Sequence, residues 1–363
     1  MIIGIDASKA AMDKRTGVEN YVYQLILNLQ KIDSKNTYYL YTNKHLPEEL
    51  LKNSNFIEKF IPFPKFWNKI RLPLELRKDK PERYLQPVYM IPKFAPTKSI
   101  GVFHDLAWKK FPEAYSPKDI ASQKRALKNL RRRAQTIICV SNSAKNDLIE
   151  VCPDLEPRLK VVYHAGNIKP SPTQFKDLLK IGQKYFLFFG RLETRKNVVN
   201  IVKAFYEAKE HSLPHKLVLV GKPGFGYDKI ETEINSNSEF SGDIIRPNFV
   251  DDATLYDLIA GAEATVYPSL YEGFGLPALE SMSIGTPVIT ANTSSLPEVV
   301  GDSAIMVDPT DFHQISDAMI KISTDSNFRQ QLSISGIEQA RHFSWQKTAE
   351  QTLKLLEELW ELP

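Results

Sequence analysis

Two carboxylates lie eight positions apart around a glycine-containing loop, and they are the residues best suited to chemistry in this sequence. Glu272 and Glu280 flank the segment Gly273–Gly275, where glycine permits backbone conformations and close approaches that other residues resist. Pro277 suits the first turn of a helix, where its missing N–H costs nothing, so we expect a helix to begin near Leu276. The free N–H groups and the positive dipole end of that helix would face the loop, which makes the loop a suitable seat for a diphosphate.

The spacing of the two carboxylates favours ligand binding over acid/base catalysis. In a continuous helix, eight residues span about 12 Å and turn by roughly 80°, so Glu272 and Glu280 would not form a close pair. Each carboxylate has two acceptor oxygens and can take paired hydrogen bonds from the vicinal hydroxyls of a ribose or a hexose. The segment therefore predicts a site that holds two ends of one elongated sugar nucleotide. The alternative is a polar loop followed by an amphipathic helix with two solvated glutamates.

The whole segment Ser269–Met282 resembles the E-x7-E signature of retaining glycosyltransferases of the GT-B class, family 4 type. The resemblance implies that Glu272 contacts the donor sugar and that Glu280 binds the nucleotide ribose. It assigns the diphosphate to the loop and the start of the helix, at Gly273, Phe274, Gly275 and Leu276. It also implies that the anomeric configuration is retained by same-face attack, in which the leaving diphosphate takes the acceptor proton. The glutamates then bind and orient the substrate, and neither attacks it.

Two cations follow a predicted strand in the second half of the chain. Arg191 and Lys196 come directly after the run 186–190, in a stretch that resembles the Gly-Arg-x4-Lys element with which this family neutralises the donor diphosphate. Fixed cations stabilise the charge that a departing nucleoside diphosphate gains, and they do so without a metal ion. The family usually has glycine after the lysine, and Asn197, which stands there, also adopts left-handed backbone geometry. A basic surface turn is the alternative.

Two residues in the first half of the chain complete the predicted site. Gly17 follows the first predicted strand and resembles a glycine whose amide approaches the donor phosphate, although the family commonly has two glycines there. His104 resembles a strand-end histidine beside the donor sugar, where it would bond a sugar hydroxyl, and we do not assign it as a general base. The alternatives are a plain helix-starting turn and a structurally bonded histidine. The catalytic candidates are His104, Arg191, Lys196 and Glu272.

Short β-branched or aromatic runs alternate with helical patterns along the chain, which is typical of parallel sheets with crossover helices. The first series of predicted strands comprises 2–6, 38–42, 100–104, 136–141 and 160–163. The second series comprises 186–190, 216–221, 244–249, 264–267, 287–290 and 304–307. Two successive doubly wound parallel-sheet units are the simplest account of this α/β pattern.

The predicted domain organisation follows from the polar, proline-containing stretch 167–173, whose composition suits a linker. We expect an acceptor-side Rossmann-like domain at 1–168 and a nucleotide-sugar-binding Rossmann-like domain at 169–345. The resemblance implies the GT-B fold, in which the two domains face a cleft and a C-terminal helix crosses back to the first domain. That helix is expected at 346–363, after a capping serine at Ser344.

Composition limits the class of protein. The 363 residues with 42% apolar content suffice for two cores, and a net charge of +4 is too mild for wholesale nucleic-acid binding. Cys139 and Cys152, without a His/Cys cluster at metal spacing, argue against a disulfide framework and a structural zinc site. Asp251 and Asp252 precede a predicted helix and are expected to cap it, so no Asp-x-Asp metal site is predicted. We expect no metal and no cofactor besides the nucleotide-sugar co-substrate.

The chain begins with an apparent strand, has no basic start with a long apolar core, and contains no apolar run long enough to span a bilayer. We therefore expect a cytoplasmic protein. The segment Lys59–Arg83 mixes Phe63, Phe66 and Trp67 with several cations, and Gln123–Arg133 is expected to form a basic helix. Such surfaces suit an anionic membrane face or a lipid-linked diphosphate acceptor, and predict peripheral attachment to the inner leaflet. Solvated charged faces are the alternative.

Three functions remain open from the sequence. The first is a retaining, metal-independent glycosyltransferase that moves a hexose from a nucleotide sugar to a glycan or lipid-linked acceptor. Mannose from GDP-mannose is preferred, because the region 104–106 looks like bacterial mannosyl- or rhamnosyltransferases of polysaccharide assembly. The second is a nucleotide-sugar epimerase on the same fold, and the third is a non-catalytic nucleotide-sugar-binding scaffold.

Overall fold

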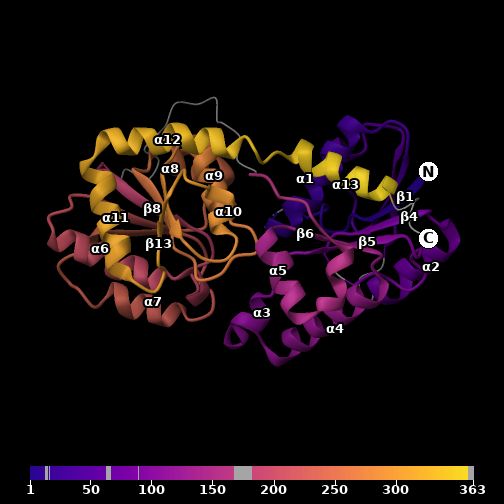
Figure 1. Cartoon of the computed structure of the whole chain (residues 1–363), viewed down its shortest axis with the longest axis horizontal. Coiled ribbons are helices and arrows are strands. Elements are labelled where there is room, and N and C mark those ends of the chain that lie inside the picture. The colour runs from indigo at the N-terminus through magenta and orange to yellow at the C-terminus, as the bar shows by residue number, and fades with distance from the viewer. Residues whose placement is uncertain (13–14, 16, 63–66, 89, 167–181, 359–363) are drawn as a thin grey trace. The chain divides into compact units, whose positions relative to one another are not determined.

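The chain divides into two compact α/β units (Figure 1). The computed structural model describes all residues except 13–14, 16, 63–66, 89, 167–181 and 359–363. The first unit comprises residues 1–109, 115–165 and 344–363, and the second comprises residues 110–114 and 166–343. The predicted boundary at residue 168 and the predicted linker 167–173 lie outside the described residues.

Among the described residues of the first unit, seven strands form one parallel sheet in the order β3-β2-β1-β4-β5-β6-β7. They are β1 (Ile2–Asp6), β2 (Thr37–Thr42), β3 (Phe56–Phe60), β4 (Arg83–Gln86), β5 (Ser99–Phe103), β6 (Thr136–Cys139) and β7 (Leu159–Val161). The strand order reverses direction between β1 and β4. In doubly wound sheets, ligands bind beyond the carboxyl ends of the strands at such a point.

Helices cover this first sheet, with α1 and α13 on one face and α4 and α5 on the other (Figure 1). The α-helices are α1 (Gly17–Ile32), α2 (Leu72–Asp79), α3 (Ala107–Lys110), α4 (Pro117–Arg133), α5 (Asn142–Val151) and α13 (Trp345–Glu358). The shorter helical turns are η1 (Glu48–Leu50), η2 (Trp67–Arg71), η3 (Pro112–Ala114) and η4 (Pro153–Arg158). The buried residues of α1 recur at helical spacing, as an amphipathic helix requires.

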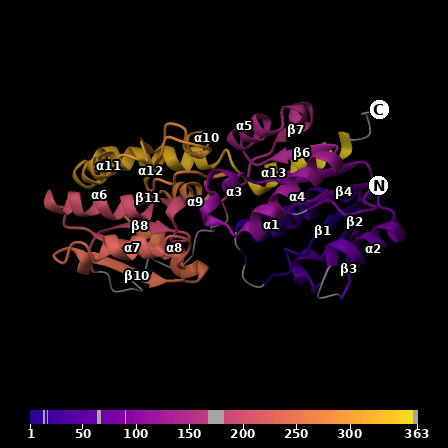
Figure 2. The same cartoon turned by 90° about the horizontal axis from the view of Figure 1, so that it is seen from below.

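The C-terminal helix α13 belongs to the first unit and packs against α1 (Figure 2). Its start is capped as predicted, because the Lys347 N–H donates to Ser344 Oγ at 3.2 Å. Thr348 Oγ1 donates to the carbonyl of Tyr163 at 2.7 Å, just beyond β7. The buried Arg83 of the central strand β4 donates its Nε to the Leu356 carbonyl at 3.3 Å. The prediction that a C-terminal helix joins the first unit is confirmed.

The second unit repeats the architecture. Within its described residues, six parallel strands have the order β10-β9-β8-β11-β12-β13, so the direction reverses between β8 and β11. The strands are β8 (Tyr185–Phe189), β9 (Lys216–Val220), β10 (Ile244–Asn248), β11 (Ala264–Tyr267), β12 (Val288–Ala291) and β13 (Ile305–Val307). The α-helices are α6 (Val198–Glu210), α7 (Tyr227–Ile234), α8 (Asp252–Gly261), α9 (Leu276–Ile284), α10 (Leu296–Val300), α11 (Phe312–Thr324) and α12 (Ser326–Ala340). The short turns are η5 (Thr194–Lys196) and η6 (Ser241–Asp243).

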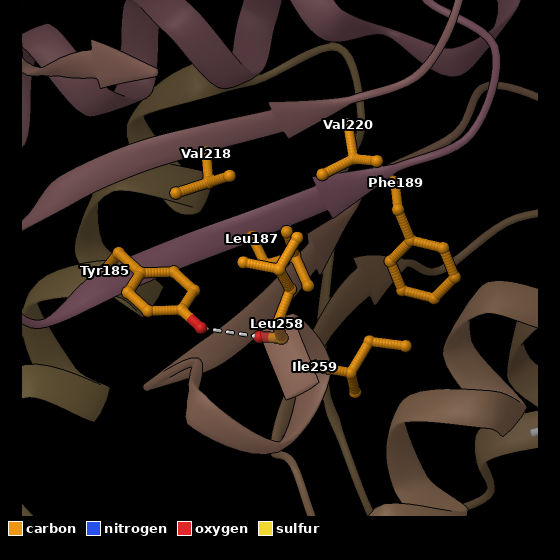
Figure 3. Packing of buried hydrophobic residues seen from close by; sticks show 7 residues of the cluster. All are labelled: Tyr185, Leu187, Phe189, Val218, Val220, Leu258 and Ile259. Carbon is orange, nitrogen blue, oxygen red and sulfur yellow. Dashed lines mark hydrogen bonds between the residues drawn. The ribbon is translucent and has the colours of Figure 1, made fainter. Parts of the chain in front are cut away.

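The second sheet has a hydrophobic core on the face that α8 covers (Figure 3). Alternate residues of β8 join residues of β9 and α8 there, and the cluster consists of Tyr185, Leu187, Phe189, Val218, Val220, Leu258 and Ile259. The intervening Phe186 and Phe188 are also fully buried, so β8 is an uninterrupted apolar run, as expected for a central strand of a parallel sheet. Each fully buried side chain of this kind contributes about 1.5–3 kcal/mol by leaving water.

The predicted aromatic surface between Lys59 and Arg83 is wrong at Trp67. The Trp67 side chain, at the start of the π-helical turn η2, is buried. Phe63 and Phe66 lie outside the described residues, whereas Ile70 and Leu74 are 48% and 46% exposed. None of the described helices is both long and apolar enough to span a bilayer.

Candidate active site

Two loops at the carboxyl edge of the second sheet are joined by hydrogen bonds. One follows β8 and ends in η5, and the other follows β11 and leads to α9. The Leu270 N–H donates to the Arg195 carbonyl at 2.9 Å, and the Asn197 side-chain amide donates to the Pro268 carbonyl at 3.0 Å. Asn197 has φ 62°, which confirms the left-handed geometry predicted for it in place of glycine. Because β8 and β11 flank the point where strand order reverses, these loops lie where a doubly wound sheet binds its ligand.

The first of these loops is also fixed by its neighbour after β9. The Gly190 N–H donates to the Val220 carbonyl, and the Leu192 N–H donates to the Lys222 carbonyl. Gly221 has φ 151°, and an added Cβ there would lie 1.7 Å from the Gly190 carbonyl oxygen. The loops after β8 and β9 therefore approach each other so closely that only glycine fits at this position. This packing holds the loop that carries Arg191 and Lys196.

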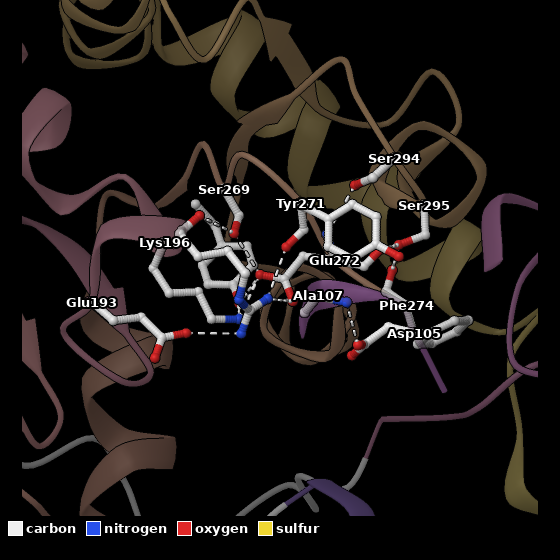
Figure 4. Close-up of polar contacts among 12 residues, drawn as sticks. Asp105, Ala107, Glu193, Lys196, Ser269, Tyr271, Glu272, Phe274, Ser294 and Ser295 are labelled. Carbon is white, nitrogen blue, oxygen red and sulfur yellow. Dashed lines mark hydrogen bonds and ion pairs between the residues drawn. The ribbon is translucent and has the colours of Figure 1, made fainter. Parts of the chain in front are cut away.

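The carboxylate of Glu272 is the centre of the site, and it is 8% exposed (Figure 4). Its Oε1 accepts three hydrogen bonds, from Lys196 Nζ at 2.5 Å, Ser269 Oγ at 2.5 Å and the Tyr267 hydroxyl at 2.8 Å. Its Oε2 accepts from Arg195 NH1 at 3.3 Å. Lys196 Nζ also donates to the Tyr267 hydroxyl at 2.6 Å. Among the described residues, three donors therefore occupy Oε1, whereas Oε2 accepts from one donor and can accept a further hydrogen bond.

The electrostatics of this buried pair follow from its contacts. Burial raises the pKa of the Glu272 carboxyl, but Lys196 and Arg195 outweigh burial and hold the pKa at about 2. Burial lowers the pKa of the Lys196 amine, and the adjacent Glu272 opposes that shift. Burial and Glu272 together raise the pKa of Tyr267 well above its usual value. At neutral pH the site thus contains a charged Lys–Glu pair beside a neutral phenol.

A third loop, after β12, holds the backbone of the glutamate and of the glycine loop. The Glu272 N–H donates to Ser294 Oγ at 3.0 Å. Ser295 Oγ lies 2.9 Å from the Glu272 carbonyl and 2.7 Å from the Phe274 carbonyl. One hydroxyl group thus contacts a carbonyl of the glutamate and a carbonyl of the glycine loop. Phe274 is itself buried, so the loop has a fixed shape before any ligand binds.

Helix α9 begins at Leu276, as predicted, with Pro277 in its first turn. Its N-cap is Gly275, which has φ 113°, and the N–H groups in the first turn of α9 lack partners within the helix, as at the start of any α-helix. Glu280 lies further along α9 and is buried, at 9% exposure. The structure therefore places Glu272 before the start of the helix and Glu280 within it.

Replacing Gly275 with alanine should weaken the fold, and with it the seat that the sequence predicts for a diphosphate. A Cβ at this position would lie 2.8 Å from Leu296 Cδ2 on a backbone conformation that L-residues disfavour, so we expect a loss of about 1–3 kcal/mol of stability. Thermal unfolding and calorimetric titration with nucleoside diphosphate would measure the two effects. Gly242→Ala is the matched control, because no atom lies within 4 Å of the added Cβ. Equal behaviour of the two variants would contradict the prediction.

Arg191, predicted as the second cation for the diphosphate, follows β8 in the same loop as Lys196 but does not contact Glu272. Its side chain is exposed, and within the described part of the chain no carboxylate pairs with it. Lys196 is engaged with Glu272 and Tyr267. Arg191 therefore remains the cation of the predicted pair that is available to an anion.

The candidates of the first unit lie at the carboxyl edge of the other sheet. His104 follows β5, and its Nε2 lies 2.9 Å from the Pro87 carbonyl. Since a carbonyl only accepts, Nε2 carries the proton and Nδ1 is the acceptor of the neutral ring. Burial lowers the pKa of His104, which favours this neutral form. Gly17 is the first residue of α1 and is exposed.

Sequence reasoning missed part of the site. Arg195, Tyr267 and Ser269 all contact the Glu272 carboxylate, and their positions at the ends of β8 and β11 were the available signal. Ser294 and Ser295 carried no signal in the sequence. Asp251 caps α8 as predicted, because it accepts from the Thr254 N–H at 2.8 Å. Among the described residues, no cluster of His, Cys, Asp and Glu has the arrangement of a metal site.

Comparison with known proteins assigns the family. The model of the family "Glycosyl transferases group 1" matches residues 171–339. O-antigen chain mannosyltransferase B of Escherichia coli is 32% identical over 265 residues, which cover 70% of this chain and 69% of that protein. The serotype-specific mannosyltransferase WbdA of E. coli is 28% identical over 228 residues, 60% of this chain and 28% of that much longer protein.

Solved structures agree on the fold. HepE of Anabaena, solved in complex with UDP and glucose, superimposes with a TM-score of 0.70 at 17% identity. The match covers 98% of this chain and 99% of HepE. The chain belongs to the group 1 glycosyltransferases, and its two parallel-sheet α/β units have the GT-B fold.

Proposed function

We propose that this enzyme transfers a hexose with retention of configuration, as a member of the family 4 type, from a nucleotide sugar to a glycan or lipid-linked acceptor in cell-surface polysaccharide synthesis. Mannose from GDP-mannose is the preferred donor, and no metal ion takes part. The observation that carries the proposal is the acceptor position on Glu272 Oε2, next to a glycine loop and a helix N-terminus. The 32% identity to an O-antigen mannosyltransferase supports the choice of mannose.

Each part of the site has a role in the proposed reaction. The diphosphate of the donor sits against the loop Gly273–Gly275 and the N-terminus of α9, with Arg191 as its cation. The sugar hydroxyls donate to Glu272 Oε2, while Lys196 keeps this carboxylate ionised and therefore an acceptor only. Glu280 takes the ribose hydroxyls. In the first unit, His104 Nδ1 accepts a hydroxyl hydrogen bond from substrate.

The chemistry of the proposed reaction needs no protein nucleophile. The bond between the anomeric carbon and the diphosphate oxygen breaks, and the acceptor hydroxyl forms a new bond to the same face of that carbon. The acceptor proton passes to the departing diphosphate. Because negative charge grows on the leaving group, fixed N–H groups and cations in a dry site stabilise the transition state more than the ground state.

A nucleotide screen should show a clear preference for one diphosphate. Thermal unfolding would be measured with GDP, UDP, ADP, dTDP and their sugar conjugates in EDTA, because binding to the native state alone raises stability by about 2.7 kcal/mol at a hundredfold excess over Kd. We expect GDP and GDP-mannose to give the largest shifts. A preference for another base would overturn the donor assignment, and a shift only with added divalent metal would overturn metal independence.

Product analysis then separates the functions. Incubation with the preferred donor and a lipid-linked or glycan acceptor should give a glycoside with the anomeric configuration of the donor, read by NMR coupling constants. Formation of an epimeric nucleotide sugar without acceptor would indicate the epimerase instead. Binding without turnover in any acceptor mixture would indicate a scaffold.

We also propose that the first unit attaches peripherally to an anionic membrane surface. Helix α4 is exposed along most of its length and carries the exposed cations Lys118, Lys124, Arg125, Lys128, Arg131 and Arg132. Ile70 and Leu74, at i and i+4, are half-exposed beside Arg77 and Lys78. Cations with exposed apolar side chains favour adsorption to anionic lipid.

Flotation with anionic vesicles at low salt should recover the wild-type protein with the vesicles. The double substitution Ile70→Ser/Leu74→Ser should lower this recovery. Ile334→Ser, at a 55% exposed position in the second unit, is the control. No flotation of the wild type would refute the attachment.

A further inference from the structure

The site contains a group of four charged side chains that is neutral as a whole, hereafter the charge quartet: Glu193, Arg195, Lys196 and Glu272. Lys196 pairs with Glu272 Oε1 at 2.5 Å, and Arg195 NH1 lies 3.3 Å from Glu272 Oε2. Arg195 NH2 pairs with Glu193 Oε1 at 2.8 Å. The quartet thus has two cations and two carboxylates. Lys196, which the sequence assigns to the diphosphate, therefore lies in a group without net charge.

Glu193 determines where the Arg195 guanidinium lies. Arg195 donates from NH2 to Glu193 Oε1 and from NH1 to the Tyr271 carbonyl, each at 2.8 Å. Its contact with Glu272 is longer by half an ångström, so Arg195 is held more closely by Glu193 and Tyr271 than by Glu272. The Glu193 and Arg195 side chains are only 13% and 16% exposed, which strengthens their ion pair relative to a surface pair.

The backbone around Glu193 is held on both sides. The preceding Leu192 donates its N–H to the Lys222 carbonyl, and the following Thr194 donates its N–H to the Phe225 carbonyl. Both acceptors belong to the loop after β9. The Glu193 carbonyl in turn accepts from the Lys196 N–H at 3.0 Å. Glu193 is therefore a fixed negative charge and not a freely moving surface side chain.

A carboxylate fixed beside an anion-binding loop lowers the affinity of that loop for anions. In the proposed reaction the diphosphate gains negative charge when its bond to the sugar breaks. Excess positive charge in the site would therefore strengthen binding of the nucleoside diphosphate product more than binding of the donor. An enzyme whose site binds its product too strongly is limited by product release. A residue that cancels one cation therefore has a use in turnover.

We propose that Glu193 is a positioning residue that holds Arg195 against the Glu272 loop and thereby limits the affinity of the site for the nucleoside diphosphate product. This inference rests on the proposed function, because it assumes that a nucleoside diphosphate binds at this loop. It gives Glu193 and Arg195 roles that differ from those of Arg191, which faces the anion directly. Arg195 orients Glu272, and Glu193 keeps Arg195 from the diphosphate.

The test is calorimetric titration of the full chain with GDP, or with whichever diphosphate binds the wild type best. Glu193→Gln should bind it about fivefold or more tightly, because an opposing charge is lost at short range. The gain should shrink in 1 M salt, where charges are screened within about 3 Å. Turnover should show a lower KM together with a lower kcat. Glu193→Ala removes the same charge and should change affinity in the same direction. A purely structural role would instead weaken binding.

A double-mutant cycle locates the effect. In an Arg195→Gln background, Glu193→Gln should change the affinity less than twofold, because the cation that Glu193 restrains is absent. Glu231→Gln is the matched control, since Glu231 also pairs with an arginine of the second unit, Arg246 at 3.5 Å. Unchanged or weaker binding in Glu193→Gln, or an equal gain in the Arg195→Gln background, would overturn the inference. If the wild type binds no nucleotide at all, the proposed function fails and the inference fails with it.

Discussion

Glu272→Gln should lower kcat/KM by about 100-fold or more, the range found when one preorganised hydrogen-bonding group of a transition state is removed. If the amide oxygen replaces Oε1 and keeps the donors Lys196 and Tyr267, the amide NH2 must replace Oε2. That NH2 faces the Arg195 guanidinium and cannot accept a sugar hydroxyl. The opposite orientation leaves Lys196 without an adequate acceptor. Both arrangements damage the site while the side-chain volume stays the same.

Steady-state kinetics with the preferred donor would measure this loss, and thermal unfolding would show whether the variant is folded under the assay conditions. Glu338→Gln, on the exposed face of α12, is the control for the change of charge. We expect the control to retain wild-type kinetics. A Glu272→Gln variant with activity within threefold of the wild type would remove Glu272 from the catalytic residues.

Lys196→Met should destabilise the protein by about 3–5 kcal/mol, the usual cost of leaving a buried charge without its partner. Lys196 and Arg195 together hold the pKa of Glu272 at about 2, so at neutral pH the buried carboxylate is charged and loses its first partner when Lys196 is replaced. Adding Glu272→Gln to Lys196→Met removes the negative charge that Lys196 no longer neutralises. The double variant should therefore recover much of the lost stability while remaining inactive. Denaturant unfolding of the two single variants and the double variant would measure the coupling.

The pH dependence gives a second readout of the same pair. In the wild type the lowered pKa of Glu272 contributes stability that is present above pH 4.5 and is lost as the pH falls toward 2. Without Lys196, only Arg195 and the remaining hydrogen bonds oppose burial, so the pKa of Glu272 rises and the destabilisation of the variant decreases as the carboxyl takes up a proton. The stability difference between wild type and Lys196→Met should therefore narrow on acidification. A difference that is constant from pH 7 to pH 4 would contradict the charged pair.

The positions of strands along the chain were predictable where burial makes a strand apolar. The run at β8 is hydrophobic on both faces and was located to within one residue, as were β9 and β11. Two strands of the first sheet, β3 and β4, were missed. β4 contains the buried polar residues Arg83 and Gln86, so it lacks the pattern of a central strand. β3 lies at the sheet edge, where half-exposed positions weaken the alternation.

The site was predictable in its residue types but not in its pairing. Glycine, proline and acidic spacing indicated the start of α9, because these residues act through local backbone physics. The contact between Lys196 and Glu272 joins residues 76 positions apart, and no local pattern shows it. Lys196 was expected to face the diphosphate directly, whereas the structure engages it with Glu272 and leaves Arg191 exposed. Long-range pairing of this kind depends on which strands become neighbours.

Helix α13 has a consequence for biosynthesis of the chain. The ribosome makes α1 early and α13 only after the entire second unit, yet the two helices pack together and Arg83 bonds to the Leu356 carbonyl. At about 5–20 residues per second, the apolar stripe of α1 stays uncovered on the nascent chain for roughly ten seconds or longer. During that time the second unit, whose segments are nearly contiguous, can fold by itself. Closure of the first unit is then a late event, and this interval is when the emerging polypeptide most needs protection by chaperones.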